Sequence, residues 1–551
     1  MTQIVGTNSV VADFNHVTLE WLANRFALER HGDEFWVAIE DLDEVAEARR
    51  NNTPPPPPAR VQFRLVTGSH HMQVFWLPVP AGNAQVGFPF TWLIEDKRWV
   101  PRQDAFIRDP QAPPQTEVWN QVCIRCHTTA SQPRPRPEED VFDSRVAELG
   151  ISCEACHGPA ERHMKHQQAL AKQPAAKKPA GPDTTIVQPR DLDHVRASHV
   201  CGFCHSMKWF DDREGWKENG FRFRPGDDLE QTTPIIRPKN LDAQPWLQRG
   251  LAKNPEILND FFWPDGMIRV AGREFNGLIE SPCYQRGQMS CLSCHSLHQS
   301  EPNDMLARGM EGNQACLQCH AKYRDETAAL TAHTRHKADS PGSLCYNCHM
   351  PHTTYALLKS IRSHQIDSPT VRTTLQTGRP NACNLCHLDQ TLDWTARTLT
   401  EWYGQPKAEL NTEQTSTAAS LLWLLKGDAG QRALAAWHLG WEPARRASDE
   451  HWQAPHLALL LDDPYSAVRY IAHKSLRQLP GFADFAFDFV GPSEARGRAK
   501  EQAFNRWIQQ RSKPVEKNLA ARLLKADGQP DQSAVARLLA ERDDRPMRLR
   551  E

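Results

Sequence analysis

The chain has 551 residues, a formal net charge of −2, and 39% hydrophobic and 24% charged residues. This composition is typical of a globular protein rather than a disordered one, and the balanced charge argues against nucleic-acid binding by bulk electrostatics. No run approaches 18 apolar residues, so the sequence predicts no transmembrane helix. The 15 cysteines cannot all pair within the chain, because their number is odd.

The N-terminal region, residues 1–119, contains no cysteine and is predicted to be a small β-rich region. Residues 35–39 follow a turn signal at residues 31–33 and are predicted to form a strand. Residues 61–66 and 72–77 flank Gly68 and predict a hairpin. Five consecutive prolines, residues 54–58, predict an extended spacer between these strands.

The central region, residues 120–390, places fourteen of the fifteen cysteines in seven Cys-x-x-Cys-His motifs. Two thiols one helical turn apart can bond the two vinyl groups of a haem, and the adjacent histidine can then bind the iron. The motifs predict seven haems c on short helices joined by irregular loops. So short a region cannot bury seven porphyrins in protein alone, so the haems must also pack against one another.

Each motif predicts two covalent attachment sites and one proximal iron ligand. The attachment cysteines are Cys123, Cys126, Cys153, Cys156, Cys201, Cys204, Cys291, Cys294, Cys316, Cys319, Cys345, Cys348, Cys383 and Cys386. The proximal histidines are His127, His157, His205, His295, His320, His349 and His387.

Other uses of paired cysteines explain the pattern less well. Structural zinc takes four ligands from two half-sites, which does not suit seven motifs that each end in histidine. A thioredoxin-like dithiol needs one motif near a βαβ unit, and a disulfide scaffold leaves the seven histidines unexplained. Cys283 lies outside the motifs, and its interpretation as a small buried thiol competes with that of a thiolate near a haem.

The remaining histidines include candidates for the distal iron ligands. Electron-transfer haems usually carry two axial ligands, whereas a haem that binds substrate leaves one position open. The histidines close to motifs are the first candidates: His163, His298, His333, His336 and His364. A second set is His70, His71, His166, His199 and His352. The number of candidates is sufficient for every haem, so it leaves the question of an open site undecided.

The C-terminal region, residues 391–551, lacks cysteine and is rich in Ala, Leu and Arg. Residues 457–476 predict a helix end, an Asp-Pro turn and a second amphipathic helix, and residues 418–437 predict a related pair. This pattern resembles HEAT-type repeats, which would bind a partner along one face or simply cap the haem region. Residues 165–183, rich in Lys, Ala, Pro and Gln, are predicted to be an exposed insertion.

Three stretches carry a resemblance to a known family: CEACHGP at residues 153–159 followed by His163, residues 289–298, and residues 345–365. They resemble multihaem cytochromes c related to cytochrome c nitrite reductase and hydroxylamine oxidoreductase, in particular those with C-terminal HEAT or tetratricopeptide-like repeats. The resemblance implies an extracytoplasmic location, closely stacked haems, mostly bis-histidine ligation and electron transfer. It implies His163, His298, His336 and His364 as distal ligands.

The sequence departs from these relatives in two respects. All seven motifs end in histidine, whereas the nitrite reductases have a lysine at the catalytic haem, and the crosslinking tyrosine of the hydroxylamine oxidoreductases is not identifiable. Haem attachment of this kind requires export, yet residues 1–9 show no secretory signal. We therefore expect the chain to be truncated or processed at its start, and the full-length protein to hold an eighth haem.

The sequence therefore favours a periplasmic or extracytoplasmic cytochrome that transfers electrons between redox partner proteins, without nucleic acid. One alternative is an oxidoreductase acting on a small nitrogen or sulfur oxyanion or hydroxylamine at one open haem. Another is a redox relay that docks to a partner through its helical repeats.

Overall fold

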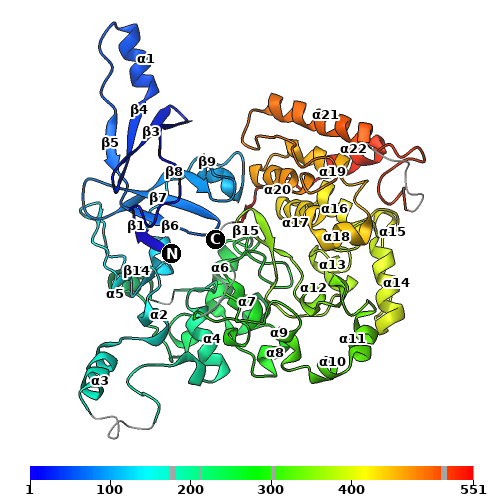
Figure 1. Cartoon of the computed structure of the whole chain (residues 1–551), viewed down its shortest axis with the longest axis horizontal. Helices are drawn as coiled ribbons and strands as arrows, with labels where there is room; N and C mark the ends of the chain where they lie inside the picture. Colours follow the sequence, from blue (N-terminus) through cyan, green and yellow to red (C-terminus); the bar gives the residue numbers. More distant parts are fainter. Residues whose placement is uncertain (174–180, 211, 299–304, 511–517, 550–551) are drawn as a thin grey trace. The chain divides into compact units, whose positions relative to one another are not determined.

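The computed structural model describes residues 1–173, 181–210, 212–298, 305–510 and 518–549 (Figure 1). The chain forms two compact units. Unit 1 comprises residues 1–103, 113–235 and 290–292, and unit 2 comprises residues 104–112, 236–289 and 293–551. The borders expected at residues 119/120 and 390/391 lie inside units 1 and 2, so the division into three regions stays a prediction. None of the described helices is long and apolar enough to span a membrane.

Two antiparallel sheets form the N-terminal part of unit 1. The four-stranded sheet has the order β2 (Val17–Trp21), β3 (Asn24–His31), β4 (Glu34–Asp41), β5 (Ala59–Gln62). The five-stranded sheet has the order β1 (Thr2–Ile4), β6 (Leu65–Thr67), β7 (Met72–Pro78), β8 (Gln85–Leu93), β9 (Arg98–Pro101). The turn between β3 and β4 uses Gly32 at φ 65°, a conformation that glycine adopts without steric cost.

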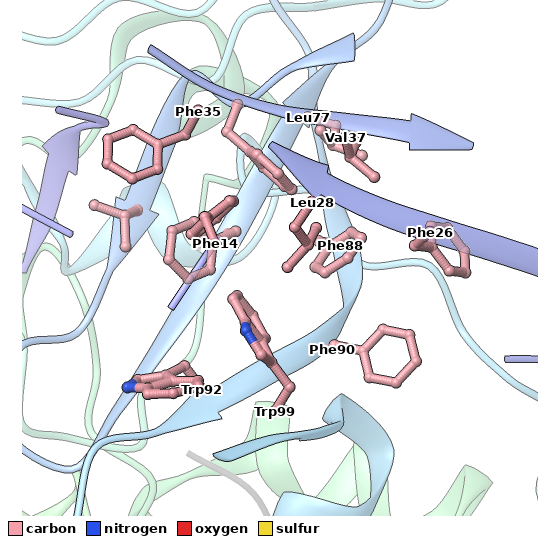
Figure 2. Close-up of a cluster of buried hydrophobic side chains, with 13 residues drawn as sticks. Phe14, Phe26, Leu28, Phe35, Val37, Leu77, Phe88, Phe90, Trp92 and Trp99 are labelled. Atoms are coloured by element: carbon pink, nitrogen blue, oxygen red, sulfur yellow. The ribbon is translucent and has the colours of Figure 1, made fainter. Parts of the chain in front are cut away.

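An aromatic core joins side chains of these two sheets, as Figure 2 shows. Phe14 packs edge to face on Phe35, Phe63 and Phe75, with ring centroids 4.9–5.5 Å apart. Trp99 lies 5.6 Å from Phe14. Phe35 and Val37 of β4 both belong to this core, as expected for alternate residues of a strand, which point to the same face of a sheet. The β-rich region predicted from the sequence is confirmed.

The strand predictions are largely correct. The predicted strand at residues 35–39 lies within β4, and β6 and β7 form the predicted hairpin, with Leu65 opposite Trp76. The run 61–66 divides between two sheets, however, because its first residues in β5 pair with β4 while Leu65 and Val66 in β6 pair with β7.

Short helices and two-stranded ribbons make up the rest of unit 1. Its further elements are α1 (Leu42–Arg50), η2 (Cys123–Arg125), β11 (Thr128–Thr129), β12 (Pro135–Arg136), β13 (Val141–Phe142), β14 (Glu148–Leu149), α2 (Cys153–His157), α3 (Glu161–Ala171), η4 (Pro189–Asp191), α4 (His194–Gly202), α5 (Arg213–Asn219) and η5 (Leu229–Gln231). In the insertion predicted at residues 165–183, α3 ends at Ala171, and residues 174–180 lie outside the described part of the chain.

The N-terminal part of unit 2 is similarly built from short elements. They are β10 (Ile107–Arg108), η6 (Pro238–Ala243), α6 (Pro245–Lys253), α7 (Glu274–Leu278), α8 (Pro282–Gln285), α9 (Gln314–Leu317), α10 (Ala321–Asp325), α11 (Thr327–Thr334), η8 (Pro341–Ser343), α12 (Cys345–His349), β15 (Thr354–Ala356), β16 (Lys359–Ile361) and α13 (Val371–Thr377). Two 3₁₀ turns span the borders between the units: η1 (Arg102–Ala105) and η7 (Cys291–Ser293).

The C-terminal part of unit 2 is mainly helical. Its elements are α14 (Leu392–Tyr403), α15 (Thr412–Ser416), α16 (Ala419–Lys426), α17 (Ala429–Gly440), α18 (Glu442–Ser448), α19 (Ala454–Leu459), η9 (Leu460–Asp462), α20 (Ser466–Leu476), α21 (Ser493–Gln510), α22 (Gln532–Ala540) and β17 (Arg548–Leu549). The helix pairs α16–α17 and α19–α20 occupy the two stretches where the sequence predicts them, and α17 packs on α20. The assignment of these helices to HEAT repeats stays a prediction.

Candidate haem-binding sites

The attachment motifs form single helical turns, as covalent attachment of a haem requires. CEACH and CYNCH are the short helices α2 and α12. In four other motifs the histidine N–H donates to the carbonyl of the first cysteine, with N···O distances of 2.8–3.0 Å at His127, His205, His320 and His387. This bond closes one helical turn and brings the two cysteines and the histidine to one face of the turn.

Several motif histidines are oriented by hydrogen bonds to backbone carbonyls. The Nδ1–H of His157 donates to the Val187 carbonyl at 2.8 Å, and that of His349 donates to the Asp367 carbonyl at 2.8 Å. A longer bond of 3.3 Å joins Nδ1 of His295 to the Met305 carbonyl. A proton on Nδ1 leaves the Nε2 lone pair available for a metal, which is the usual arrangement of a histidine ligand.

Three motif histidines of unit 2 each face a second imidazole. The ring centroids of His295 and His364 are 6.2 Å apart, and the rings are inclined by 22°. The rings of His349 and His333 are 6.0 Å apart and inclined by 3°. Those of His387 and His336 are 6.0 Å apart and inclined by 30°.

These separations match two imidazoles that share one metal. An imidazole nitrogen binds a metal at about 2.0–2.1 Å and lies about 1.1 Å from its ring centre, so two opposed ligands place their ring centres about 6.2 Å apart. The three pairs therefore fit the two axial positions of a haem iron.

Histidines of these pairs are also held in the neutral state that binds metals. Burial and the neighbouring His349 lower the pKa of His333. Burial and the neighbouring His336 lower the pKa of His387. A neutral imidazole is the form that coordinates iron, so both shifts favour ligation at neutral pH.

The other candidate histidines have different surroundings. Nδ1 of His163, in α3, lies 2.8 Å from Oδ2 of Asp183, a contact that would orient an iron ligand. Nδ1 of His199 instead accepts from the Leu229 N–H, which places its proton on Nε2 and disfavours ligation through that nitrogen. His352 is enclosed by Trp437, Trp441 and His438. Its ring and that of His438 have centroids 5.7 Å apart and are inclined by 65°, but neither histidine belongs to an attachment motif.

Four further candidates lie in other surroundings. Nδ1 of His70 lies 2.8 Å from the Ser69 hydroxyl, and His71 accepts the Ile94 N–H at its carbonyl. His166 is half-buried on α3, and His298 is exposed after the fourth motif. Their assignment as distal ligands stays a prediction.

Contacts between cysteines of different motifs show which attachment sites are neighbours in unit 1. The Cys204 thiol hydrogen-bonds Cys126, and this contact and burial raise the pKa of Cys204. The Cys201 thiol hydrogen-bonds Cys291, which raises the pKa of Cys201 in the same way. Cys156 is close enough to Cys201 to add to the effect of burial, and its pKa is raised to about 11. The third motif therefore adjoins the first, the second and the start of the fourth.

Contacts between cysteines also show which of the remaining motifs are neighbours in unit 2. The Cys316 thiol hydrogen-bonds Cys345, which links the fifth motif to the sixth. Burial raises the pKa of Cys294, and the nearby Cys319 of the fifth motif adds to that rise. Burial and the nearby Cys348 raise the pKa of Cys383 to about 12, which links the sixth motif to the seventh. The fourth motif contributes Cys291 to unit 1 and Cys294 to unit 2.

Cys283 is half-buried in α8 rather than fully buried. Burial raises the pKa of its thiol, and the neighbouring Cys319 of the fifth motif adds to the rise. The isolated cysteine thus favours the protonated thiol, and it lies close enough to Cys294 and Cys316, attachment cysteines of two motifs, to contribute to the rise of their pKa values.

Arg362 supports the helix of the sixth motif, a role that was not predicted from the sequence. Its guanidinium lies 4.1 Å from the Tyr346 ring centre and donates to the carbonyls of Tyr346 and Met350 and to the side chain of Asn347. It therefore satisfies the C-terminal carbonyls of α12. Burial lowers the pKa of Arg362 to about 10. The only signal in the sequence was its position two residues before His364.

Two family models match parts of the chain. Residues 284–325 match the doubled CXXCH motif, and residues 99–158 match cytochrome c554 and c-prime. The first match covers the fourth and fifth attachment motifs, and the second covers the first and second motifs. Comparisons with curated proteins and with solved structures give no significant match. The family matches support a multihaem c-type cytochrome with covalently bound haem and a role in electron transfer.

Proposed function

We propose that this chain is an electron-transfer cytochrome that holds seven haems c and conducts electrons along them. The three opposed histidine pairs of unit 2 are the observation on which the proposal rests. When bound, the haems supply reversible one-electron redox chemistry, and saturation of both axial positions by histidine suits electron transfer rather than substrate binding.

The distal ligands in unit 2 follow from these pairs. His364 serves the haem attached at the fourth motif, His333 the sixth and His336 the seventh. His163 is held by Asp183 as a ligand would be, and we assign it to a haem of unit 1. Each of these residues would bind an iron through its imidazole and so exclude other ligands from that position.

The neighbouring cysteines give the order in which the attachment sites follow one another. In unit 1 the first and second motifs both adjoin the third, which adjoins Cys291 of the fourth. In unit 2 Cys294 adjoins the fifth motif, the fifth adjoins the sixth, and the sixth adjoins the seventh. This order supports a branched path for electrons at the first two motifs, both of which adjoin the third, and a single path from the fifth motif to the seventh.

Location and partners are part of the same proposal. Covalent haem attachment occurs outside the cytoplasm, so we place the protein in the periplasm or another extracytoplasmic compartment. Its partners are then redox proteins that donate and accept electrons, and the C-terminal helices are the proposed docking region for one of them.

The bound-haem count tests the proposal. Intact mass and the pyridine haemochrome absorbance together give haems per chain, and seven are expected. The double variant Cys383→Ser, Cys386→Ser should hold six. A wild-type protein with fewer than seven haems would show that some motif is vacant, and one with no haem would overturn the proposal.

A further inference from the structure

One motif histidine of unit 2 lacks the opposed imidazole that the other three possess. All 24 histidines of the chain lie within the described residues. His295, His349 and His387 each face a second ring, whereas His320 makes no ring contact anywhere in the described residues. His320 is exposed at the start of α10, and its side chain forms no hydrogen bond to a described residue.

Three candidate distal histidines of unit 2 already face other motif histidines. His320 is close enough to His333 to affect its pKa, yet the ring of His333 faces His349 with an inclination of only 3°. A histidine that lies parallel to one proximal ligand at 6.0 Å cannot also complete a second haem. The rings of His336 and His364 likewise face those of His387 and His295, respectively.

We infer that the haem attached at Cys316 and Cys319 has only one protein ligand, His320, and that its distal position is open to a small exogenous ligand. This inference rests on the proposed function, because it requires that the fifth motif carry a haem. A metal that keeps one position free is the arrangement used for binding and activation, as catalytic zinc sites and ligand-binding haems show. The fifth haem is thus the site where a small molecule could exchange electrons with the chain of haems.

Carbon monoxide is a suitable probe, since it binds ferrous haem only where an axial position is free or readily freed. The fully reduced wild-type protein, with its haem count measured on the same sample, is titrated with carbon monoxide and followed by absorbance. One carbon monoxide per seven haems is expected. Electron paramagnetic resonance of the oxidised protein should show a high-spin ferric signal.

Variants then locate the open haem. Cys316→Ser with Cys319→Ser should give six haems and no carbon monoxide binding, whereas the matched control Cys383→Ser with Cys386→Ser should give six haems and retain one equivalent. His320→Met keeps both attachment cysteines and should shift the absorbance of the carbon monoxide complex, because it changes the opposite ligand. Cys383→Ser with Cys386→Ser, which removes the seventh haem, should leave the absorbance of that complex unchanged. The His320→Met comparison remains decisive if the double cysteine variant does not mature.

The outcomes separate this inference from the proposed function. Seven haems with no carbon monoxide binding and no high-spin signal would overturn the open site while leaving the electron-transfer function intact. Binding that survives loss of Cys316 and Cys319 would assign the open position to another haem and overturn the inference too. A wild type without binding whose Cys283→Ser variant gains one equivalent would show that the Cys283 thiolate occupies the position. Fewer than seven haems, with the fifth motif vacant, would instead refute the proposed function.

Discussion

The buried ion pair between Arg269 and Asp428 offers a sharp test of how the haem-bearing part of unit 2 is attached to its C-terminal helices. The guanidinium and carboxylate make three contacts of 2.9–3.1 Å, and their side chains are only 3% and 4% exposed. Arg269 also lies 4.0 Å from the Trp263 ring centre. Asp428 caps α17 and receives a second contact, at 2.9 Å, from the half-exposed Arg545.

Removing the charge of Asp428 should lower the free energy of unfolding, because it leaves the buried guanidinium of Arg269 without this negatively charged partner. Asp428→Asn keeps a side chain suited to the cap but leaves Arg269 without its only paired acid among the described residues. Breaking a buried pair from one side costs about 3–5 kcal/mol. At about 2–4 °C per kcal/mol for a domain of this size class, the apparent Tm should fall by about 6–20 °C.

Replacing Arg269 should lower the free energy of unfolding less than replacing Asp428 does. The difference between the two variants therefore tests the reasoning. In Arg269→Met the carboxylate of Asp428 keeps Arg545 and its helix N–H groups as partners. Arg545→Ala removes only a half-exposed partner and should cost about 0–1 kcal/mol. Calorimetry of holoproteins with equal haem content measures all three. An Asp428→Asn protein within 1 kcal/mol of wild type, or less perturbed than Arg269→Met, would refute this reasoning.

Three other predictions concern the pH dependence of stability, one distal haem ligand and the half-buried Arg362. Burial alone would raise the pKa of Asp428, but Arg269 outweighs it and lowers the folded-state value to about 2. The stabilisation should therefore be complete above about pH 4 and lost as the pH falls toward 2, a change of about 2–3 kcal/mol that acid-unfolding curves of Asp428→Asn should lack. His364→Ala should open the haem opposite His295 and raise carbon monoxide binding by one equivalent; an unchanged titration would contradict the pairing. Arg362→Met, which loses three hydrogen bonds and the contact with Tyr346, should lower the free energy of unfolding by about 2–4 kcal/mol in guanidinium titrations, and an unchanged midpoint would count against its role.

The attachment motifs can be identified from the sequence because they are local. Two cysteines and a histidine within one helical turn need no tertiary information, and the apolar run at residues 35–39 after a turn signal likewise sufficed to predict a strand. The distal ligands are a tertiary property. His336 faces His387 across 51 positions of sequence, and spacing alone could not separate it from His352, which is enclosed by tryptophans instead.

The split of residues 61–66 between two sheets has the same origin. Alternation marks the residues as extended, but which sheet each half joins depends on partners that are distant in the sequence: Val61 pairs with Val37, and Leu65 pairs with Trp76. The aromatic core between those partners decides the outcome, and no local pattern records it.

Burial differs sharply between the β region and the attachment motifs, and this difference indicates what holds each together. Phe14, Phe75 and Phe88 are at most 1% exposed, so the aromatic core of unit 1 is complete without any cofactor. No motif cysteine or motif histidine, in contrast, is fully buried. We expect an attached haem to supply packing partners for these side chains, so that the free energy of haem binding adds to the folding free energy of the central region. The β region can therefore fold before haem attachment, whereas the segments that carry the motifs depend on it.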